Sequence, residues 1–251
     1  MSTEKSLALV LRLVDFSETS VIATLFTRDF GKIHGLAKGA RRLKGPFESA
    51  LDLLCLSRLV FLRKSSDALD LLTEAKLERR FRAAARDLSR LYAGYYVAEL
   101  LDELTDDGDP HPELFDFACE TLAALDTGPQ PVSSVLMSFE LSALRVLGHL
   151  PLLDQCVECG TEMNGSGRVA FGMLAGGVLC ARCRPGKPKV VSLSGAAWQM
   201  LRDYAQSDEK RPSGEPDRRA YGEVRGVLNQ YLSHLLGRRP RMHEYLGVLA
   251  S

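Results

Sequence analysis

Four of the six cysteines lie between residues 156 and 183, as two C-x2-C pairs separated by twenty residues. Two residues between cysteines allow one tight turn to direct both thiolates at a single point, and two such turns complete a tetrahedron around a metal ion. Soft thiolates favour zinc. The spacing is close to that of a zinc ribbon. We therefore predict one zinc ion bound by Cys156, Cys159, Cys180 and Cys183, with the glycine-rich stretches MNGSGR and AGGV as hairpin turns between short strands.

A pair of redox-active dithiols is the alternative, because a single C-x-x-C can be thioredoxin-like. The N-terminal residues contain no apolar signal core and no small-residue cleavage site, so we expect a cytoplasmic protein. Thiols stay reduced there, which favours a metal over disulfides. Four thiolates also leave no open coordination position, so the expected zinc is structural rather than catalytic. We expect Cys55 and Cys119 to be packing thiols of the core.

Residues 1 to about 80 have the pattern of short strands. Leu7, Leu9, Leu11 and Leu13 alternate with other residue types, and the stretch 20–27 is rich in β-branched side chains. A third strand is expected at 32–39, broken by Gly35 and Gly39, and two further extended runs follow before residue 78. Five short strands with glycine breaks predict a small barrel or sandwich.

From about Glu78 the apolar period changes to that of helices. Leu88, Leu91, Tyr95, Ala98 and Leu101 form one stripe, and further helices are expected at about 112–125, 132–147, 194–206 and 217–236. The composition of 207–217 is typical of a mobile linker. We divide the α+β chain into a barrel (1–80), a helical region (81–150), a zinc element (151–190) and C-terminal helices that pack on the helical region (191–251).

Charge is distributed unevenly, although the net charge is zero. Eleven acidic residues and no Lys or Arg lie between Leu91 and Leu144, whereas six basic residues and one acid lie between Arg28 and Lys44. A mobile basic loop beside a barrel can follow a phosphate backbone, and Phe30 and Phe47 could stack on bases. The candidate DNA-binding residues are Lys32, Lys38, Arg41, Arg42 and Lys44. A solvated loop is the alternative reading of the same residues.

The sequence lacks the G-x-x-x-x-G-K-[ST] phosphate loop and the G-x-S-x-G nucleophile elbow. Its five histidines are scattered, and no H-x-E precedes a cysteine pair as in the nucleobase deaminases. These residues support neither an ATPase nor a hydrolase, and no stretch is long and apolar enough for a membrane span. We expect no enzymatic activity.

Two long motifs resemble the family of the recombination-repair protein RecO. The stretch VLRLVDFSETSVIATLFT followed by FGKIHGLAKGARR is similar to the N-terminal domain of that family, over residues 6 to about 82. The segment LDQCVECG … GGVLCARC follows at the expected distance. The resemblance implies an N-terminal oligonucleotide-binding (OB) barrel and a helical region with an inserted zinc element. By residue, it supports Lys38, Arg41 and Arg42 first, with Lys32 and Lys44 as weaker candidates.

The resemblance also implies a function without catalytic turnover. Members bind single- and double-stranded DNA, anneal complementary strands without ATP, and help to load a recombinase onto strands coated by single-stranded-DNA-binding protein (SSB). They act with the ring-forming partner RecR and often with RecF, and we expect this chain to associate with the nucleoid in the cytoplasm. Two other hypotheses remain open: a zinc-ribbon adaptor that binds only proteins, and a zinc-dependent hydrolase or deaminase.

Overall fold

The computed structural model describes residues 2–42, 45–47, 49–64, 68–83, 87–164, 167–206 and 217–246. Candidate residue Lys44 and most of the expected linker, 207–216, lie outside the described residues. The chain forms two compact units, residues 1–128 and 129–251, which we describe separately. The division into four segments stays a prediction. None of the helices in the described part of the chain is long and apolar enough to cross a membrane.

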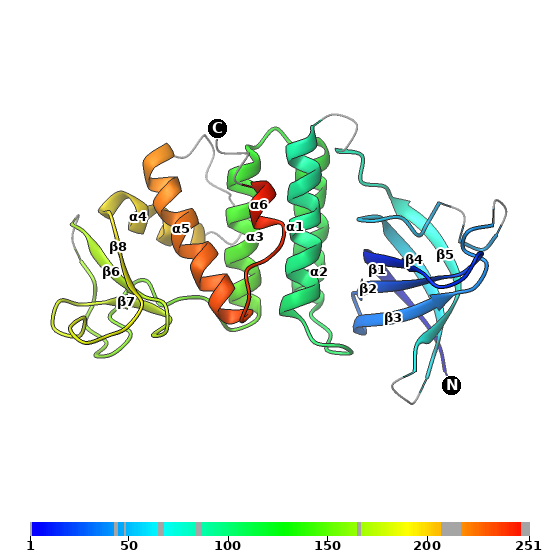
Figure 1. Cartoon of the computed structure of the whole chain (residues 1–251), viewed down its shortest axis with the longest axis horizontal. Coiled ribbons are helices and arrows are strands. Elements are labelled where there is room, and N and C mark those ends of the chain that lie inside the picture. The colour runs from blue at the N-terminus through cyan, green and yellow to red at the C-terminus, as the bar shows by residue number, and fades with distance from the viewer. Residues whose placement is uncertain are drawn as a thin grey trace. The chain divides into compact units, whose positions relative to one another are not determined.

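The first unit begins with a closed five-stranded barrel (Figure 1). The strands are β1 (Ser2–Asp15), β2 (Val21–Thr27), β3 (Gly31–Ala37), β4 (Leu56–Arg63) and β5 (Asp70–Arg79). Their order around the barrel is β1-β2-β3-β5-β4, with β4 paired back to β1. Only the β3–β5 pair is parallel, and the other pairs are antiparallel. This is the topology of an OB barrel, so the predicted α+β class and N-terminal barrel are confirmed.

Small side chains fill much of the barrel interior. Ala8, Ala23 and Ala37 are fully buried there, together with larger residues such as Leu25 and Phe61. Five strands enclose little space, so alanines are needed beside the larger side chains. The alternating leucines predicted β1 correctly. However, Ala8 and Val10, and not Leu7 and Leu9, face the barrel core.

A bulge in β1 changes which side chains face inward. The register with β2 shifts between Val10 and Arg12, so that Leu13 packs on the core although Leu7 and Leu9 do not. One extra residue reverses the alternation of a strand. The predicted break of β3 at Gly35 is wrong, because the strand runs through it. Gly35 is needed for packing: a Cβ there would lie 2.6 Å from Cδ2 of Leu72.

Two helices complete the first unit: α1 (Leu88–Leu104) and α2 (Pro112–Thr127). Pro112 begins α2, at the start of the expected helix, and Leu114, Ala118, Leu122 and Leu125 are among its buried side chains. The stripe predicted for α1 is only partly correct, because Leu88 is exposed whereas Tyr96 and Val97 are fully buried. Phe115 of α2 packs against Phe26 of β2, with ring centroids 6.0 Å apart. This contact covers part of the outer face of the barrel.

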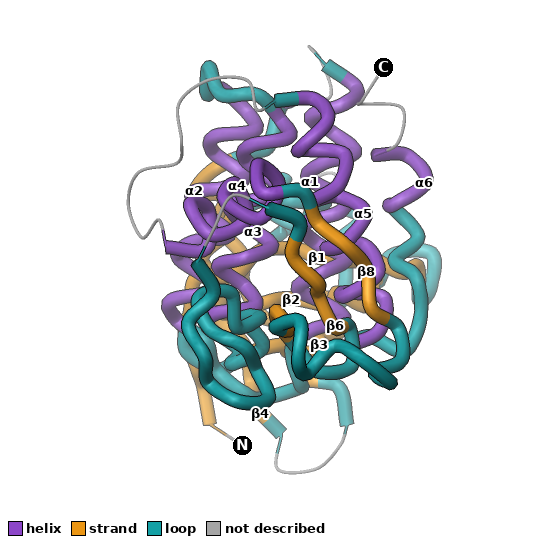
Figure 2. The backbone as a smooth tube through the Cα atoms, turned by 90° about the vertical axis from the view of Figure 1, so that its left-hand side faces the viewer, coloured by secondary structure: helices purple, strands orange, loops and turns teal. Residues whose placement is uncertain are grey.

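The second unit combines helices with a small three-stranded sheet. Its helices are α3 (Val132–Val146), α4 (Gly195–Gln206), α5 (Arg218–Leu235) and α6 (His243–Leu246). Its strands are β6 (Val169–Gly172), β7 (Gly177–Leu179) and β8 (Val190–Leu193), in the order β7-β6-β8. In Figure 2 the strands β6 and β8 are flanked by long loops. Ser194 Oγ accepts the N–H of Ala197 at 3.2 Å, so Ser194 caps the N-terminus of α4.

Candidate metal centre and nucleic-acid interface

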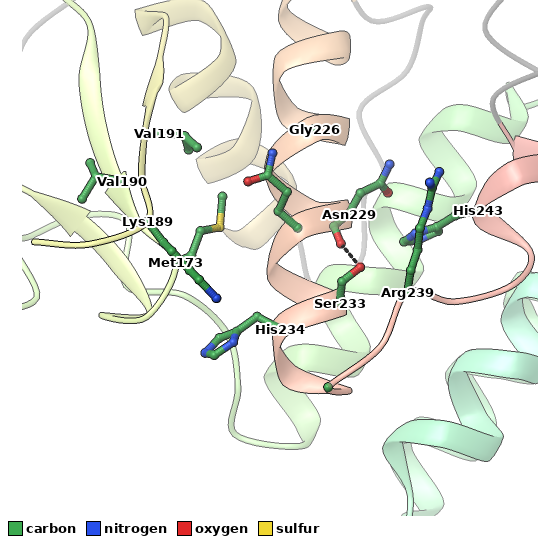
Figure 3. Close-up of a pocket in the computed structure, with 12 residues that line it drawn as sticks. Met173, Lys189, Val190, Val191, Gly226, Asn229, Ser233, His234, Arg239 and His243 are labelled. Atoms are coloured by element: carbon green, nitrogen blue, oxygen red, sulfur yellow. Dashed lines mark hydrogen bonds between the residues drawn. The ribbon is translucent and has the colours of Figure 1, made fainter.

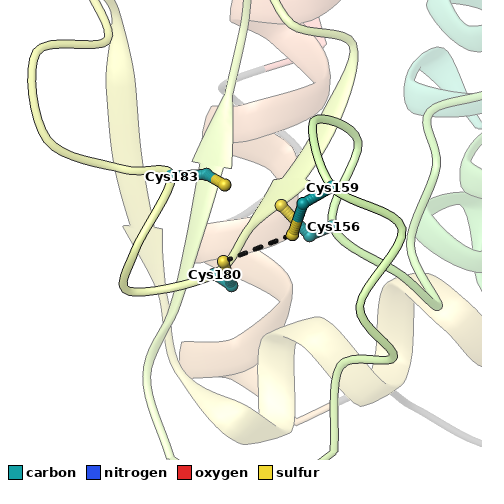
Figure 4. Close-up of side chains that lie close together, drawn as sticks. All are labelled: Cys156, Cys159, Cys180 and Cys183. Atoms are coloured by element: carbon teal, nitrogen blue, oxygen red, sulfur yellow. Dashed lines mark hydrogen bonds between the residues drawn. The ribbon is translucent and has the colours of Figure 1, made fainter.

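The four cysteines of the two C-x-x-C pairs meet at one point (Figure 4). Their Sγ atoms all lie within 4.8 Å of one another, and those of Cys159 and Cys180 are 3.8 Å apart. A zinc ion with Zn–S bonds of about 2.3 Å requires sulfurs about 3.8 Å apart at the corners of a tetrahedron. The four thiols therefore fit one tetrahedral metal ion.

Each pair sits on a tight backbone turn. In the first turn the N–H of Gly160 donates to the carbonyl of Cys156 at 2.8 Å, and Gly160 has a φ of +69°. Glycine adopts this left-handed conformation without steric cost. The second turn follows β7, and there the N–H of Arg184 donates to the carbonyl of Cys180 at 3.0 Å. Each half of the site is thus formed by a short local turn, and the sheet brings the two halves together.

The surroundings of the thiols shift their pKa values in different directions. Hydrogen bonds from Thr161, first through its hydroxyl and then through its N–H, lower the pKa of Cys159 to about 6. Hydrogen bonding to the thiols of Cys180 and Cys159 raises the pKa of Cys183 to about 12. The pKa of one thiol is therefore lowered and that of another is raised within the same cluster. A divalent cation would favour the thiolate form, because it binds thiolates directly.

The side chains around the four thiols leave the sulfur atoms as the expected metal ligands. The nearby carboxylate of Glu158 forms an ion pair with Lys187 at 2.7 Å. Cys156 is buried in a small cluster with Ala170 and Leu179 of the sheet. The remaining cysteines do not join the site, and burial raises the pKa of Cys55 and, to about 12, that of Cys119. Both behave as packing thiols.

Three of the predicted DNA-binding residues are exposed at the turn that follows β3. Lys38, Arg41 and Arg42 reach solvent around Gly39, which has a φ of +75°. The N–H of Arg41 donates to the carbonyl of Thr19 at 3.2 Å, and its guanidinium donates to Asp15 at 2.9 Å. These contacts tie the turn to the loop between β1 and β2.

Lys32 lies elsewhere, on the side of the barrel that meets α1. Its Nζ donates to the backbone carbonyls of Asp102, at 2.5 Å, and Thr105, at 2.8 Å. The carboxylates of Asp102 and Asp107 lie at 3.5 and 3.7 Å. An ammonium that is buried and already paired is not available to a phosphate, so we omit Lys32 from the proposed DNA site.

Several acids of the segment 91–144 pair with the barrel. Besides the two partners of Lys32, Asp116 accepts two hydrogen bonds from Arg28, at 2.9 and 2.8 Å. Asp107 also lies 3.1 Å from Nε2 of His34. Part of the uneven charge distribution therefore serves contacts inside the first unit.

The two phenylalanines proposed as base-stacking residues pack in or against the core of the barrel. Phe47 is 3% exposed and belongs to the core, and Phe30 packs edge-on against Phe61 with centroids 5.5 Å apart. The expectation is wrong for Phe47, because a side chain in the core cannot stack on a base. The sequence reasoning missed Phe16, which is 60% exposed in the loop between β1 and β2. The available signal was an aromatic residue inside the otherwise polar turn DFSETS.

A cavity of about 810 Å³ lies in the second unit between β8 and α5 (Figure 3). Its cationic side chains include Lys189 and Arg239, and no carboxylate or cysteine lines it among the described residues. The hydroxyl of Ser233 donates to the carbonyl of Asn229 at 2.6 Å. This lining does not match an activated nucleophile with its base.

Comparisons with known proteins agree with the two motifs and the fold. Residues 1–81 match the family described as "Recombination protein O N terminal", and residues 85–244 match "Recombination protein O C terminal". The DNA repair protein RecO of Rhodopirellula baltica is 45% identical, over 96% of this chain and 97% of its own length. That of Anaeromyxobacter dehalogenans is 38% identical, over 99% and 98%. That of Moorella thermoacetica is 32% identical, over 96% and 89%. The chain therefore belongs to the RecO family of DNA repair proteins.

Proposed function

We propose that this protein binds single- and double-stranded DNA through the turn after β3 and anneals complementary strands without ATP. Lys38, Arg41 and Arg42 are the proposed contacts, and Lys44 is a further candidate outside the described residues. The observation that carries the proposal is the exposure of these three cations at one end of an OB barrel. Within the described residues Lys38 and Arg42 form no ion pair and Arg41 pairs with the exposed Asp15, whereas Lys32 is buried and paired. Membership of a family of DNA repair proteins supports the same ligand.

The proposed contacts are to phosphates. Lysine and arginine that neutralise phosphates release counterions, so binding is independent of sequence and falls as salt rises. Such contacts can hold a strand while its bases stay free to pair with a second strand. Annealing then needs no nucleotide hydrolysis, in keeping with a sequence that contains no phosphate-binding loop for ATP.

We also propose that Cys156, Cys159, Cys180 and Cys183 bind one structural zinc ion. The 3.8 Å sulfur separation and the all-thiol ligand set support zinc. The ion would hold the two turns together and keep the second unit folded. With all four positions taken by protein, it would supply no catalytic chemistry, and we propose that the protein is not an enzyme.

The partners that we propose come from the family resemblance. They are RecR, often together with RecF, and strands coated by SSB onto which a recombinase is loaded. A role on chromosomal DNA would place the protein in the cytoplasm with the nucleoid.

The test is a titration of the reduced, full-length protein with labelled single-stranded and duplex oligonucleotides over a range of salt concentrations. The proposal predicts binding to both at low salt, with log K falling linearly as log[salt] rises. An absence of binding at low salt would reject it and favour a zinc-ribbon adaptor that contacts only proteins.

A further inference from the structure

Among the described residues of the first unit, part of the outer face of the barrel is covered by neither α1 nor α2. We call it the open face, and it consists of Arg12, Val14, Phe16, Ile22, Leu36 and Lys38. The strand register places Val14, Ile22 and Leu36 side by side on β1, β2 and β3. Their chain neighbours Leu13, Ala23 and Ala37 point into the core, so these three point outward.

The open face differs from the covered end of the same strands. Phe26, also outward on β2, is fully buried under Phe115 of α2. In contrast, Val14 is 47% exposed, and Ile22 and Leu36 are only half-buried. The barrel thus presents a short apolar strip to solvent, three strands wide.

Phe16 lies at the end of this strip and is held in a defined turn. Its side chain is 60% exposed, yet its N–H donates to the carbonyl of Ser20 at 3.0 Å, and the N–H of Ser17 donates to the same carbonyl at 3.2 Å. A single exposed apolar residue is common on protein surfaces. Here a closed turn holds the backbone that carries the ring, and Phe16 follows the outward-facing Val14 by two residues, so the exposed ring offers a platform for a flat ligand.

Cations border the strip. Arg12 is outward on β1, and Lys38 and Arg42 are exposed at the turn after β3. None of these three forms an ion pair within the described part of the chain, and the nearby acid Asp15 is paired with Arg41. Glu18 is the remaining acid of the β1–β2 loop. The surface therefore combines an apolar and aromatic centre with a positively charged border.

We propose that the open face binds a single strand of nucleic acid with one base stacked on Phe16, and that this stacking favours unpaired strands over duplex. The inference rests on the proposed function, because it needs a nucleic-acid ligand. An unpaired base can present its π-face to an aromatic side chain, whereas in a duplex that face is occupied by the neighbouring bases. The apolar strip suits bases, and the cations at its border suit phosphates.

Anisotropy titrations with labelled oligothymidylate and with an abasic strand of the same length test the proposal. The variants are Phe16→Ala, Phe16→Tyr and, as a control for the loss of an exposed apolar side chain, Leu88→Ala. Phe16→Ala is expected to weaken oligothymidylate binding by about 5- to 150-fold, the range measured for base–aromatic stacking. The slope of log K against log[salt] should not change, since no charge is removed. Phe16→Tyr should bind like the wild type.

The outcomes separate this inference from the proposed function. If the wild type binds DNA but folded Phe16→Ala binds oligothymidylate equally well, the stacking role is wrong while DNA binding stands. If Phe16→Ala weakens the abasic strand as much as oligothymidylate, Phe16 acts through the shape of its loop and the stacking role is again overturned. If the wild type binds no DNA at low salt, the proposed function fails first.

Discussion

Replacing Lys32 by methionine should destabilise the first unit and leave DNA binding intact. The side chain of Lys32 is 10% exposed, and its ammonium hydrogen-bonds with two carbonyls at the C-terminal end of α1. Methionine can replace the aliphatic stem but not the donors. The change therefore leaves the carbonyls of Asp102 and Thr105 without this partner.

The size of the effect follows from these contacts. A hydrogen bond from a charged donor contributes about 1.5–3 kcal/mol, and a cation at a helix C-terminus about 0.3–1 kcal/mol. Loss of one partner of a buried pair costs about 3–5 kcal/mol. The carboxylate of Asp107 is 62% exposed and can regain water, which places the expected loss at the lower end, about 3 kcal/mol.

Urea denaturation followed by circular dichroism measures this loss. With a slope of about 1–3 kcal/mol per molar urea, the midpoint should fall by about 1–3 M. The matched control is Lys38→Met, whose side chain is exposed on the same stretch of chain and should leave the midpoint unchanged. In DNA titrations the order should be reversed: Lys38→Met should flatten the salt dependence of DNA binding, and Lys32→Met should leave it unchanged. A Lys32→Met protein of wild-type stability and flattened salt dependence would refute the reasoning.

Three further predictions concern other features. The reduced protein should contain about one zinc ion by elemental analysis. The Cys180→Ser variant should lose the metal and the local structure around it. A metal-free wild type would contradict the zinc assignment. Gly31→Ala should lower the free energy of unfolding in urea melts by at least about 3 kcal/mol, because φ is +67° and a Cβ would lie 2.2 Å from the carbonyl oxygen of Asp109. Gly148→Ala, with φ of +75° in open space, should lower it by only about 1–2 kcal/mol. Equal losses in the two variants would contradict this reasoning. Burial, aided by two arginines, lowers the pKa of His243 to about 4 from an ordinary 6.5, so the unfolded chain binds its proton more tightly. Stability should therefore be fully present above pH 6.5 and fall toward pH 4, and melts of His243→Gln should show a shallower fall; an identical pH profile would reject the assignment.

The meeting of the four cysteines could be predicted from the sequence because the geometry of each pair is local. Two residues between cysteines set each turn, and Gly160 marks the backbone conformation that the first turn requires. The barrel was also predictable as a set of strands. The inward-facing side of β1 was not, since alternation identifies a strand without saying which side faces the core. The bulge between Val10 and Arg12 then reverses the pattern within the strand.

The candidate DNA-binding residues were harder to select, because basic residues look alike in a sequence. Lys32 and Lys38 lie on the same stretch of chain, but Lys32 is covered by the end of α1, some seventy residues further along, and Lys38 is not. Phe47 and Phe16 differ in the same way, one in the core and the other in solvent. Only the tertiary contacts decide which of these side chains a ligand can reach.

The central claim is that the exposed cations after β3 hold DNA by its phosphates. The most direct measurement is the salt dependence of DNA binding by the Arg41→Ala/Arg42→Ala double variant, with Lys5→Ala/Lys76→Ala, two exposed cations on other strands of the barrel, as the matched control. We expect the slope of log K against log[salt] to fall by roughly 1.4 on single strands and 1.8 on duplex, since each phosphate contact contributes about 0.7 and 0.9. ATP-independent annealing should slow in parallel. A folded double variant with the wild-type slope and annealing rate would contradict the account.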